Sequence, residues 1–193
     1  MARPREFDLD EVLSQIMEIF WKEGYEKTSF AMIEEQTGVK KASLCAAYGD
    51  KRNLFLTALR RYQERSLQTC QQQSEQGSAT DALRQRLRSA ARMASGTEAQ
   101  RGCFQVNCII EIAPHDPEVA ALVKAHANRV AAQFAALIRR GQQNGEFRTD
   151  TEASILAKYV ISSIYGLSVS GKAGMSAREI ERIIEVILSS LEG

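Results

Sequence analysis

The sequence predicts an all-α fold of about nine helices, and three observations support this prediction. The chain has 193 residues and 3 prolines, and the span 5–113 contains none of them, so it lacks the strongest helix breaker. The same span is rich in Ala, Leu, Gln, Glu and Arg, which favour helix. Finally, no segment combines alternating apolar and polar residues with β-branched enrichment, which is the pattern of a strand.

The first three helices are expected to be close together at the start of the chain. Apolar residues recur every three to four positions across 8–23, where Asp8 is the expected N-cap and Gly24 the end. Two short helices are then expected over 30–38 and 40–47.

The middle of the chain predicts longer helices. Asp50 is expected to cap a fourth helix over 50–75, although the polar run 71–78 favours a frayed end or a loop. A fifth helix is expected over 80–96, where small and apolar residues share one face.

Four helices are expected in the remainder. A sixth over 99–112 stops before a proline, and a seventh over 117–141 starts with proline at its first turn, where the missing N–H costs nothing. The eighth, over 150–171, is apolar on nearly all sides and should be largely buried. The ninth, over 176–191, has one apolar stripe.

Composition and charge exclude several classes of protein. Lys+Arg is 25 and Asp+Glu is 24, which gives a net charge of +1 and excludes a strongly basic nucleic-acid coat protein. No run of 18 apolar residues indicates a membrane span, and the start of the chain lacks the apolar core of a signal peptide. The 4 cysteines are therefore expected to be free thiols in a reducing cytoplasm.

Residues 36–39, with the sequence Gln-Thr-Gly-Val, predict the turn of a helix-turn-helix. Gly38 supplies the backbone freedom of a tight turn, and Val39 and Leu44 are expected to hold the two short helices together. The start of the second helix in such a motif meets base edges in the major groove of DNA. Its expected outward residues are Lys40, Lys41, Ala42, Ser43, Cys45 and Ala46.

The first turn of the fourth helix contains two cations, Lys51 and Arg52. Cations there oppose the helix dipole, whereas a bound phosphate would reverse that sign. The alternative is a solvated charge pair beside Asp50. The span 27–61 contains 7 basic and 3 acidic residues, so the cations of this near-neutral chain gather around the predicted motif.

The segment from Phe7 to Tyr62 resembles the DNA-binding domain of TetR-family transcriptional regulators. The matching positions include Val12-Leu13, Phe20, Gly24-Tyr25, Thr28-Ser29, Ile33, Gly38-Val39, Ser43-Leu44, Tyr48-Gly49-Asp50-Lys51 and Leu54-Phe55. The resemblance implies a homodimeric regulator, usually a repressor, that binds a palindromic double-stranded DNA operator. It also implies a helix-turn-helix domain over 1–50 and a ligand-binding and dimerisation domain over 51–193, connected by the fourth helix.

The resemblance places the DNA contacts residue by residue. Thr28, Ser29 and Lys51 would touch phosphates, and Lys40, Lys41 and Ser43 would lie in the major groove, with Ala42 and Tyr48 in the same interface. Cys45 departs from the family, which usually has an aromatic residue there whose hydroxyl reaches a phosphate. A thiol is a poor substitute for that hydrogen bond. It is either a natural variation or a redox-sensitive group at the DNA surface.

The last two helices are expected to form a four-helix bundle with those of a second copy, because they are too apolar for a free surface. Packing within the chain alone is the alternative. In this family the domain beyond the fourth helix also holds the inducer, whose identity is unknown. The expected lining residues are Cys70, Phe104, Asn107, Cys108, Glu111, Phe134, Tyr159, Ser163 and Tyr165.

The run 102–107, with the sequence Gly-Cys-Phe-Gln-Val-Asn, resembles a motif in a branch of the family that includes thiol-based sensors. In those sensors a lysine near the end of the eighth helix lies close to the reactive cysteine. The resemblance pairs Cys103 with Lys172, and a nearby ammonium favours the reactive thiolate. Alternatively, Cys103 is an ordinary packing residue.

Other classes of function have less support. The sequence has no phosphate-binding glycine loop and no nucleophile elbow, so we expect no enzyme and no cofactor. A metal-responsive regulator is one alternative, with Cys103, Cys108 and His115 as the metal ligands. These residues lack the close sequence spacing that is usual for metal ligands. A helical interaction module without DNA binding is the other alternative, and it predicts no salt-dependent affinity for DNA.

Overall fold

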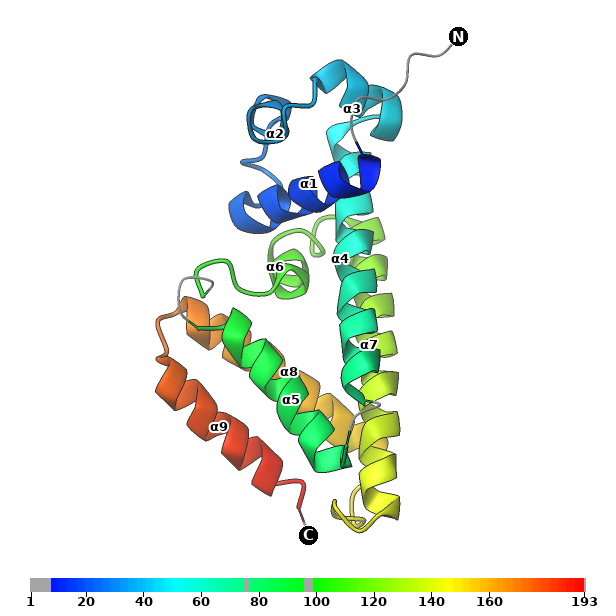
Figure 1. Cartoon of the computed structure of the whole chain (residues 1–193), viewed down its shortest axis with the longest axis vertical. Coiled ribbons are helices and arrows are strands. Elements are labelled where there is room, and N and C mark those ends of the chain that lie inside the picture. The colour runs from blue at the N-terminus through cyan, green and yellow to red at the C-terminus, as the bar shows by residue number, and fades with distance from the viewer. Residues whose placement is uncertain (1–7, 75–76, 96–98, 193) are drawn as a thin grey trace. The chain divides into compact units, whose positions relative to one another are not determined.

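The computed structural model describes residues 8–74, 77–95 and 99–192, and this part of the chain contains nine α-helices and no strand (Figure 1). The all-α prediction is therefore confirmed. The helices are α1 (Leu9–Glu23), α2 (Phe30–Thr37), α3 (Lys41–Tyr48), α4 (Lys51–Ser74), α5 (Ala79–Met93), α6 (Phe104–Glu111), α7 (Pro117–Gln143), α8 (Ala153–Lys172) and α9 (Ala177–Ser189).

The chain divides into two compact units, one up to Arg65 and the other from Ser66 onward. The division lies inside α4, the helix that the sequence predicts to connect two domains. The division comes about 15 residues after the expected domain boundary at residue 50. The reason is that the first half of α4 packs with the three helices before it.

The first unit packs α1, α2 and α3 around the start of α4 (Figure 1). Asp8 caps α1 as predicted, since its carboxylate accepts a hydrogen bond from the Asp10 N–H at 2.8 Å. The Phe20 ring meets the Phe55 ring edge-on, with 5.3 Å between centroids. Aromatic pairs in this geometry stabilise a core beyond their buried area. Ile33 of α2 is also fully buried.

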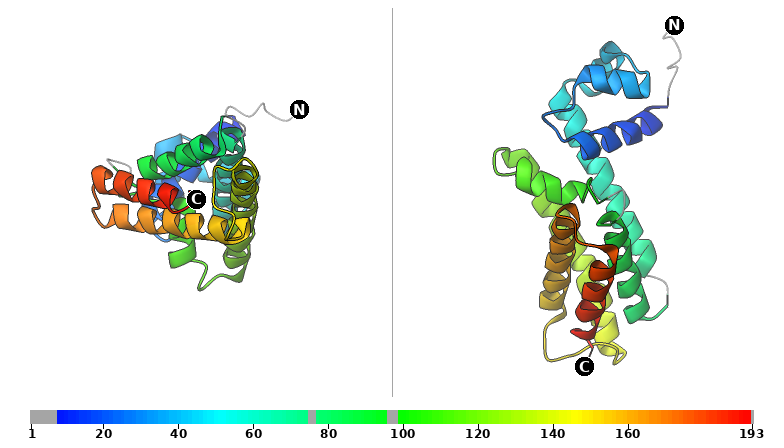
Figure 2. Two further views of the ribbon diagram at one scale, coloured as in Figure 1. Left: turned by 90° about the horizontal axis from the view of Figure 1, so that it is seen from below. Right: turned by 90° about the vertical axis from the view of Figure 1, so that its left-hand side faces the viewer.

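The second unit is built from α5, α7, α8 and α9, and α6 packs against α7 and α8. The helices α5, α8 and α9 lie side by side in both views of Figure 2. The apolar stripe of α9 faces inward, with Ile184 fully buried, so it is used within the chain. Glu179 and Ser176 form a capping box at the start of α9.

Among the described residues, α8 is the one helix that is long and apolar enough to cross a membrane. Its buried residues, Val160 among them, instead belong to the core of the second unit. The helix is less buried than the sequence predicts, because Ile155, Tyr159 and Val169 are exposed. Length and composition alone are weak evidence for a span.

Several helix boundaries differ from the prediction. The sixth helix begins at Phe104 rather than 99, because Gly102 has a φ of +63° and α-helix cannot continue through it. The eighth begins at Ala153 rather than 150. The fifth ends at Met93, before the expected end at Gly96, which itself lies outside the described residues. The helix α4 extends to Ser74, so the first part of the polar run 71–78 is helical.

Candidate nucleic-acid interface

The predicted turn between α2 and α3 is present. Gly38 has a φ of 71°, in the left-handed region, and its N–H donates to the Glu34 carbonyl at 2.9 Å. A Cβ at this position would meet no atom within 4 Å, so the backbone conformation alone requires glycine. Val39 and Leu44 are both buried, as expected of residues that pack between the two short helices.

The start of α3 is an exposed surface. Lys40, Lys41 and Ala42 are exposed, Ser43 is half-buried, and Leu44 is turned into the core. Four consecutive positions therefore reach solvent before the helix meets its own unit. This arrangement suits insertion of a helix start into a groove.

Glu34 of α2, in the same unit, accepts hydrogen bonds from donors at the start of α3. Its carboxylate accepts a hydrogen bond from the Lys40 ammonium at 2.7 Å and another from the Lys41 N–H at 3.1 Å. The hydrogen bond from Lys40 lowers the pKa of Glu34, and Glu34 in turn raises the pKa of Lys40. Glu34 thus occupies the kind of position that a phosphate oxygen takes at a helix N-terminus.

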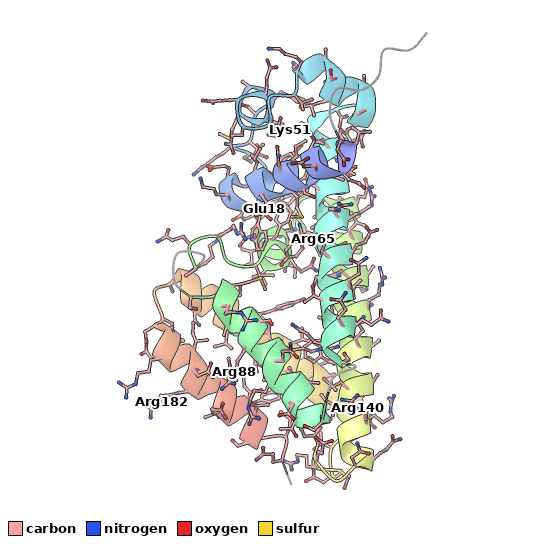
Figure 3. The ribbon with its side chains drawn as sticks, viewed as in Figure 1. Glu18, Lys51, Arg65, Arg88, Arg140 and Arg182 are labelled. Carbon is pink, nitrogen blue, oxygen red and sulfur yellow. The ribbon has the colours of Figure 1, made fainter. Side chains whose placement is uncertain are left out.

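Lys51, labelled in Figure 3, begins α4 and is held by its neighbours. Its ammonium donates to the Glu26 carbonyl at 3.2 Å and lies 4.5 Å from the centroid of the Tyr25 ring. Asp50 caps the same helix by accepting from the Asn53 N–H at 2.7 Å. The side chain of Lys51 is therefore positioned beside a helix N-terminus, where an anion is favoured.

The two predicted phosphate contacts before α2 are in different environments. Ser29 is exposed and caps α2, accepting from the Met32 N–H at 3.2 Å. Thr28 is fully buried, and its hydroxyl donates to the Gly24 carbonyl at 2.7 Å. This burial corrects the expectation for Thr28, because its side chain closes a turn inside the unit and does not reach the surface.

The remaining predicted contacts lie farther along α3. Cys45 is a half-buried free thiol, and Tyr48 is half-buried with its hydroxyl donating to the Leu9 carbonyl at 3.3 Å. The Tyr48 hydroxyl therefore links α3 to the start of α1.

In the second unit, Lys172 approaches the predicted sensor segment. Its ammonium donates to Asn107 Oδ1 at 3.1 Å, and its stem covers Gly102 so closely that a Cβ there would clash. Cys103 is half-buried beside this contact, at the N-cap of α6. Lys172 and Cys103 are thus brought into the same small region.

Two other titratable groups near Cys103 have raised pKa values, the buried Cys108 and the half-buried Tyr165. Burial raises the pKa of the Cys108 thiol, and a charge on Cys103 raises it further. Burial, again with Cys103, raises the pKa of Tyr165 to about 12. All cysteines in the described residues are free thiols.

Several of the expected ligand-lining residues lie inside the second unit, and two do not. Phe104, Cys108 and Phe134 are buried, and Cys70, Asn107, Ser163 and Tyr165 are half-buried. The expectations for Glu111 and Tyr159 need correction because both side chains are exposed.

Glu111 is exposed because it ends α6. Tyr159 is 42% exposed on the outer side of α8, and its hydroxyl accepts from Ser190 at 3.3 Å. The Ser163 hydroxyl donates to the Tyr159 carbonyl of its own helix at 3.0 Å. Glu111 and Tyr159 therefore belong to the helix surface, whereas the place of half-buried Ser163 in a ligand lining stays a prediction.

Sequence reasoning missed several buried polar side chains in the second unit, among them Arg86, Gln105 and His126, and the half-buried Gln133. The signal for Arg86 was available, since it falls on the apolar stripe of α5 between Leu83 and Leu87. A charged residue in the register of a core stripe must be explained by a partner or a ligand. In the described part of the chain, no group of three or more His, Cys, Asp and Glu side chains could hold a metal ion.

Comparisons with known proteins cover almost the whole chain. The family model described as "Bacterial regulatory proteins, tetR family" matches residues 12–58, and "Tetracyclin repressor-like, C-terminal domain" matches residues 79–187. The chain is 30% identical over 194 residues to YezE of Bacillus subtilis (strain 168), an uncharacterized HTH-type transcriptional regulator, with 100% of both chains covered. It is 32% identical over 187 residues to the HTH-type transcriptional repressor ComR of Escherichia coli (strain K12), with 94% of this chain and 88% of ComR covered.

A solved structure with operator DNA is also similar. It contains a cysteine mutant of the TetR family transcriptional regulator CifR complexed with 26-bp double-strand operator DNA. The TM-score is 0.84 at 29% identity, with 97% of this chain and 99% of that chain covered.

Proposed function

The chain belongs to the TetR family of transcriptional regulators, and we propose that it is a repressor released from a palindromic operator when its second unit is modified or occupied. It is a DNA-binding regulator and not an enzyme. We also propose that the protein is a homodimer and that it acts in the cytoplasm. Residues 1–50 would contact DNA, and residues 51–193 would form the dimer and hold the inducer.

The exposed start of α3 is the observation that carries the DNA-binding part. Lys40, Lys41, Ala42 and Ser43 would enter the major groove, and Ser29 and Lys51 would bind phosphates on either side. In this binding mode a phosphate displaces Glu34 from Lys40 and from the N-terminus of α3. Cys45 would face the DNA with a thiol in place of the usual hydroxyl.

The outer faces of α8 and α9 support a homodimer. The inner stripe of α9 is used within the chain, yet four large apolar side chains remain exposed on these two helices. They are Ile155, Tyr159, Val169 and Val186, with exposed fractions of 51%, 42%, 46% and 63%. Apolar side chains gathered on one face in this way are typical of an interface, and a second copy would cover them.

Operator binding can be tested with the DNA that flanks the gene for this protein. We expect a gel shift on that DNA that weakens steeply as salt rises. Salt-insensitive binding, or no binding to DNA selected from the genome, would favour the interaction-module alternative.

Thiol modification is one candidate release signal because Cys103 is half-buried and close to Lys172. Hypochlorite or a maleimide should release the wild type and Cys70→Ser from DNA, while Cys103→Ser stays bound. Cys70 is the matched control because it is also a half-buried free thiol of the second unit. Full release of Cys103→Ser would refute this signal and leave non-covalent induction.

A further inference from the structure

Arg86 of α5 is buried in the second unit, with only 3% of its surface exposed. Its guanidinium lies over the Phe134 ring, 4.6 Å from the centroid. One nitrogen, Nη2, donates to the Cys70 carbonyl and to the Ser74 hydroxyl near the end of α4. The other two nitrogens, Nε and Nη1, are buried without a hydrogen-bond partner in the described structure.

The positive charge of Arg86 has no counter-ion among the described residues. A charged neighbour of the same sign is also present, because Arg140 of α7, labelled in Figure 3, reaches the end of α4 as well. Its Nη1 donates to the Ser74 carbonyl at 2.8 Å. Burial is the main cause that lowers the pKa of Arg86, and Arg140 lowers it further. A buried charge without a partner destabilises the protein that contains it.

Gln133 supplies a second unsatisfied polar group in the same region. Its amide nitrogen donates to the Leu67 carbonyl of α4 at 3.3 Å, whereas its Oε1 is buried without a hydrogen-bond partner in the described structure. Gln133 precedes Phe134 in α7, and Leu67 is one turn before Cys70 in α4. Orphaned donors of Arg86 and an orphaned acceptor of Gln133 therefore lie along the same segment of α4.

A purely structural role for Arg86, holding the end of α4, does not explain its unpaired nitrogens. Arg140 already binds the Ser74 carbonyl, and Arg86 needs only one of its three nitrogens for its contacts with α4. A methionine of similar length would fill the space without a charge. The unpaired donors point instead to an absent acceptor.

We propose that Arg86 is the anchor for a small organic carboxylate whose apolar body packs against Phe134, with Gln133 accepting a hydrogen bond from a donor on the ligand. This inference deepens the proposed function by giving the chemical class of the inducer. Guanidinium is the side chain best suited to a buried carboxylate because it stays charged and offers several N–H groups. Leu83 and Leu87, fully buried on the same helix, favour an apolar body over a bare inorganic ion. The orphaned atoms are closed off from solvent, so neighbouring side chains must move as the ligand enters.

The test measures thermal unfolding and calorimetric titration with four probes: benzoate, 4-hydroxybenzoate, benzamide and inorganic phosphate. Arg86→Met removes the charge, and Arg92→Met is the matched control, since Arg92 is an exposed arginine of the same helix. We expect one or both carboxylates to stabilise the wild type and Arg92→Met, with no effect of benzamide. Arg86→Met should lose at least about tenfold in carboxylate affinity.

Four results would overturn the proposal. They are no response of the wild type to either carboxylate, an equal response of Arg86→Met, an equal response to benzamide, and a response to phosphate alone. The unliganded Arg86→Met protein should unfold no earlier than the wild type, because it loses an unpaired charge. A large loss of stability would instead show that Arg86 only clamps α4.

If Arg86→Met does not fold, Arg86→Lys keeps the charge, and it should bind the carboxylate more weakly than the wild type. Unchanged affinity in Arg86→Lys would also contradict the proposal. Gel shifts with the same variants separate this inference from the proposed function. Failure of the carboxylate site leaves operator binding intact, whereas failure of operator binding leaves the calorimetric result intact.

Discussion

The two units of the molecule place positive charge in opposite ways. In the first unit, Lys40 is exposed and Lys51 is half-buried, and each ammonium donates to an oxygen that a phosphate can replace. In the second unit, Arg86 is buried and lacks a counter-ion among the described residues. Surface ammonium groups with exchangeable partners suit reversible contact with a long polyanion. An interior guanidinium with free donors suits a single small anion.

Loss of the ring that covers Arg86 should have the largest effect. Phe134→Ala removes a buried aromatic side chain and uncovers the guanidinium face, and we expect the free energy of unfolding to fall by about 3–5 kcal/mol. Urea denaturation followed by circular dichroism measures this change. Ala136→Gly, at an exposed position of the same helix, is a suitable control for helix propensity. A loss below about 1 kcal/mol would show that the interior near Arg86 is loosely packed.

Buried His126 gives the second unit a pH-dependent stability. Burial, with a contribution from Arg129, lowers the pKa of His126 from 6.5 to about 4. The unfolded chain therefore takes up this proton first, so stability is lost as pH falls from 6.5 to about 4. The loss should be on the order of 2 kcal/mol.

His126→Gln should flatten the stability curve in that window, as measured by urea denaturation at a series of pH values. His115→Gln, at an exposed histidine, should leave the curve unchanged. The same slope in all three proteins would mean that His126 is not the titrating group.

Removal of single lysines from the first unit should have smaller effects, and only on DNA binding. Lys51→Ala should weaken binding to all sequences by about 1 kcal/mol and reduce the salt slope by roughly one. Lys41→Ala should weaken binding and also change site preference, because its position is at the start of α3. Fluorescence anisotropy with the operator and a scrambled duplex measures both. Equal affinity in all proteins would contradict the assignment of α3 to the groove.

Glu34→Gln should have the smallest effect, and in the opposite direction. The pKa of Glu34 is lowered by Lys40, so the carboxylate is charged at neutral pH and must be displaced by DNA. Its neutral amide should increase affinity a few-fold, more for non-specific DNA than for the operator. Glu35→Gln, at the exposed neighbouring position, should change affinity less. Weaker binding by Glu34→Gln would show that this carboxylate serves α3 rather than competing with DNA.

Local signals were enough to predict most of the fold and the helix-turn-helix that forms the candidate DNA interface. The cap at Asp8 and the turn at Gly38 depend on residues within a few positions, and both are confirmed. The predicted start of the sixth helix was wrong because composition does not show which glycines adopt a left-handed backbone, as Gly102 does.

Side-chain direction was harder to predict than helix position. Thr28 and Ser29 are adjacent and similar in chemistry, yet one is fully buried and the other exposed, which depends on how the chain turns before α2. Tyr159 was assigned to the interior because α8 is apolar on most sides, and only tertiary packing decides which side faces out. The partners of Arg86 come from α4 and α7, so no local pattern could supply them.

Gly102 is constrained twice, and one of the constraints comes from a residue far away in the sequence. A side chain at 102 would face both a left-handed backbone and the stem of Lys172, so shortening residue 172 relieves only one of the two obstacles. The constraint is not reciprocal, because a shorter side chain at 172 clashes with nothing at Gly102. The turn before Cys103 therefore tolerates substitution of Lys172, whereas it does not tolerate substitution of Gly102.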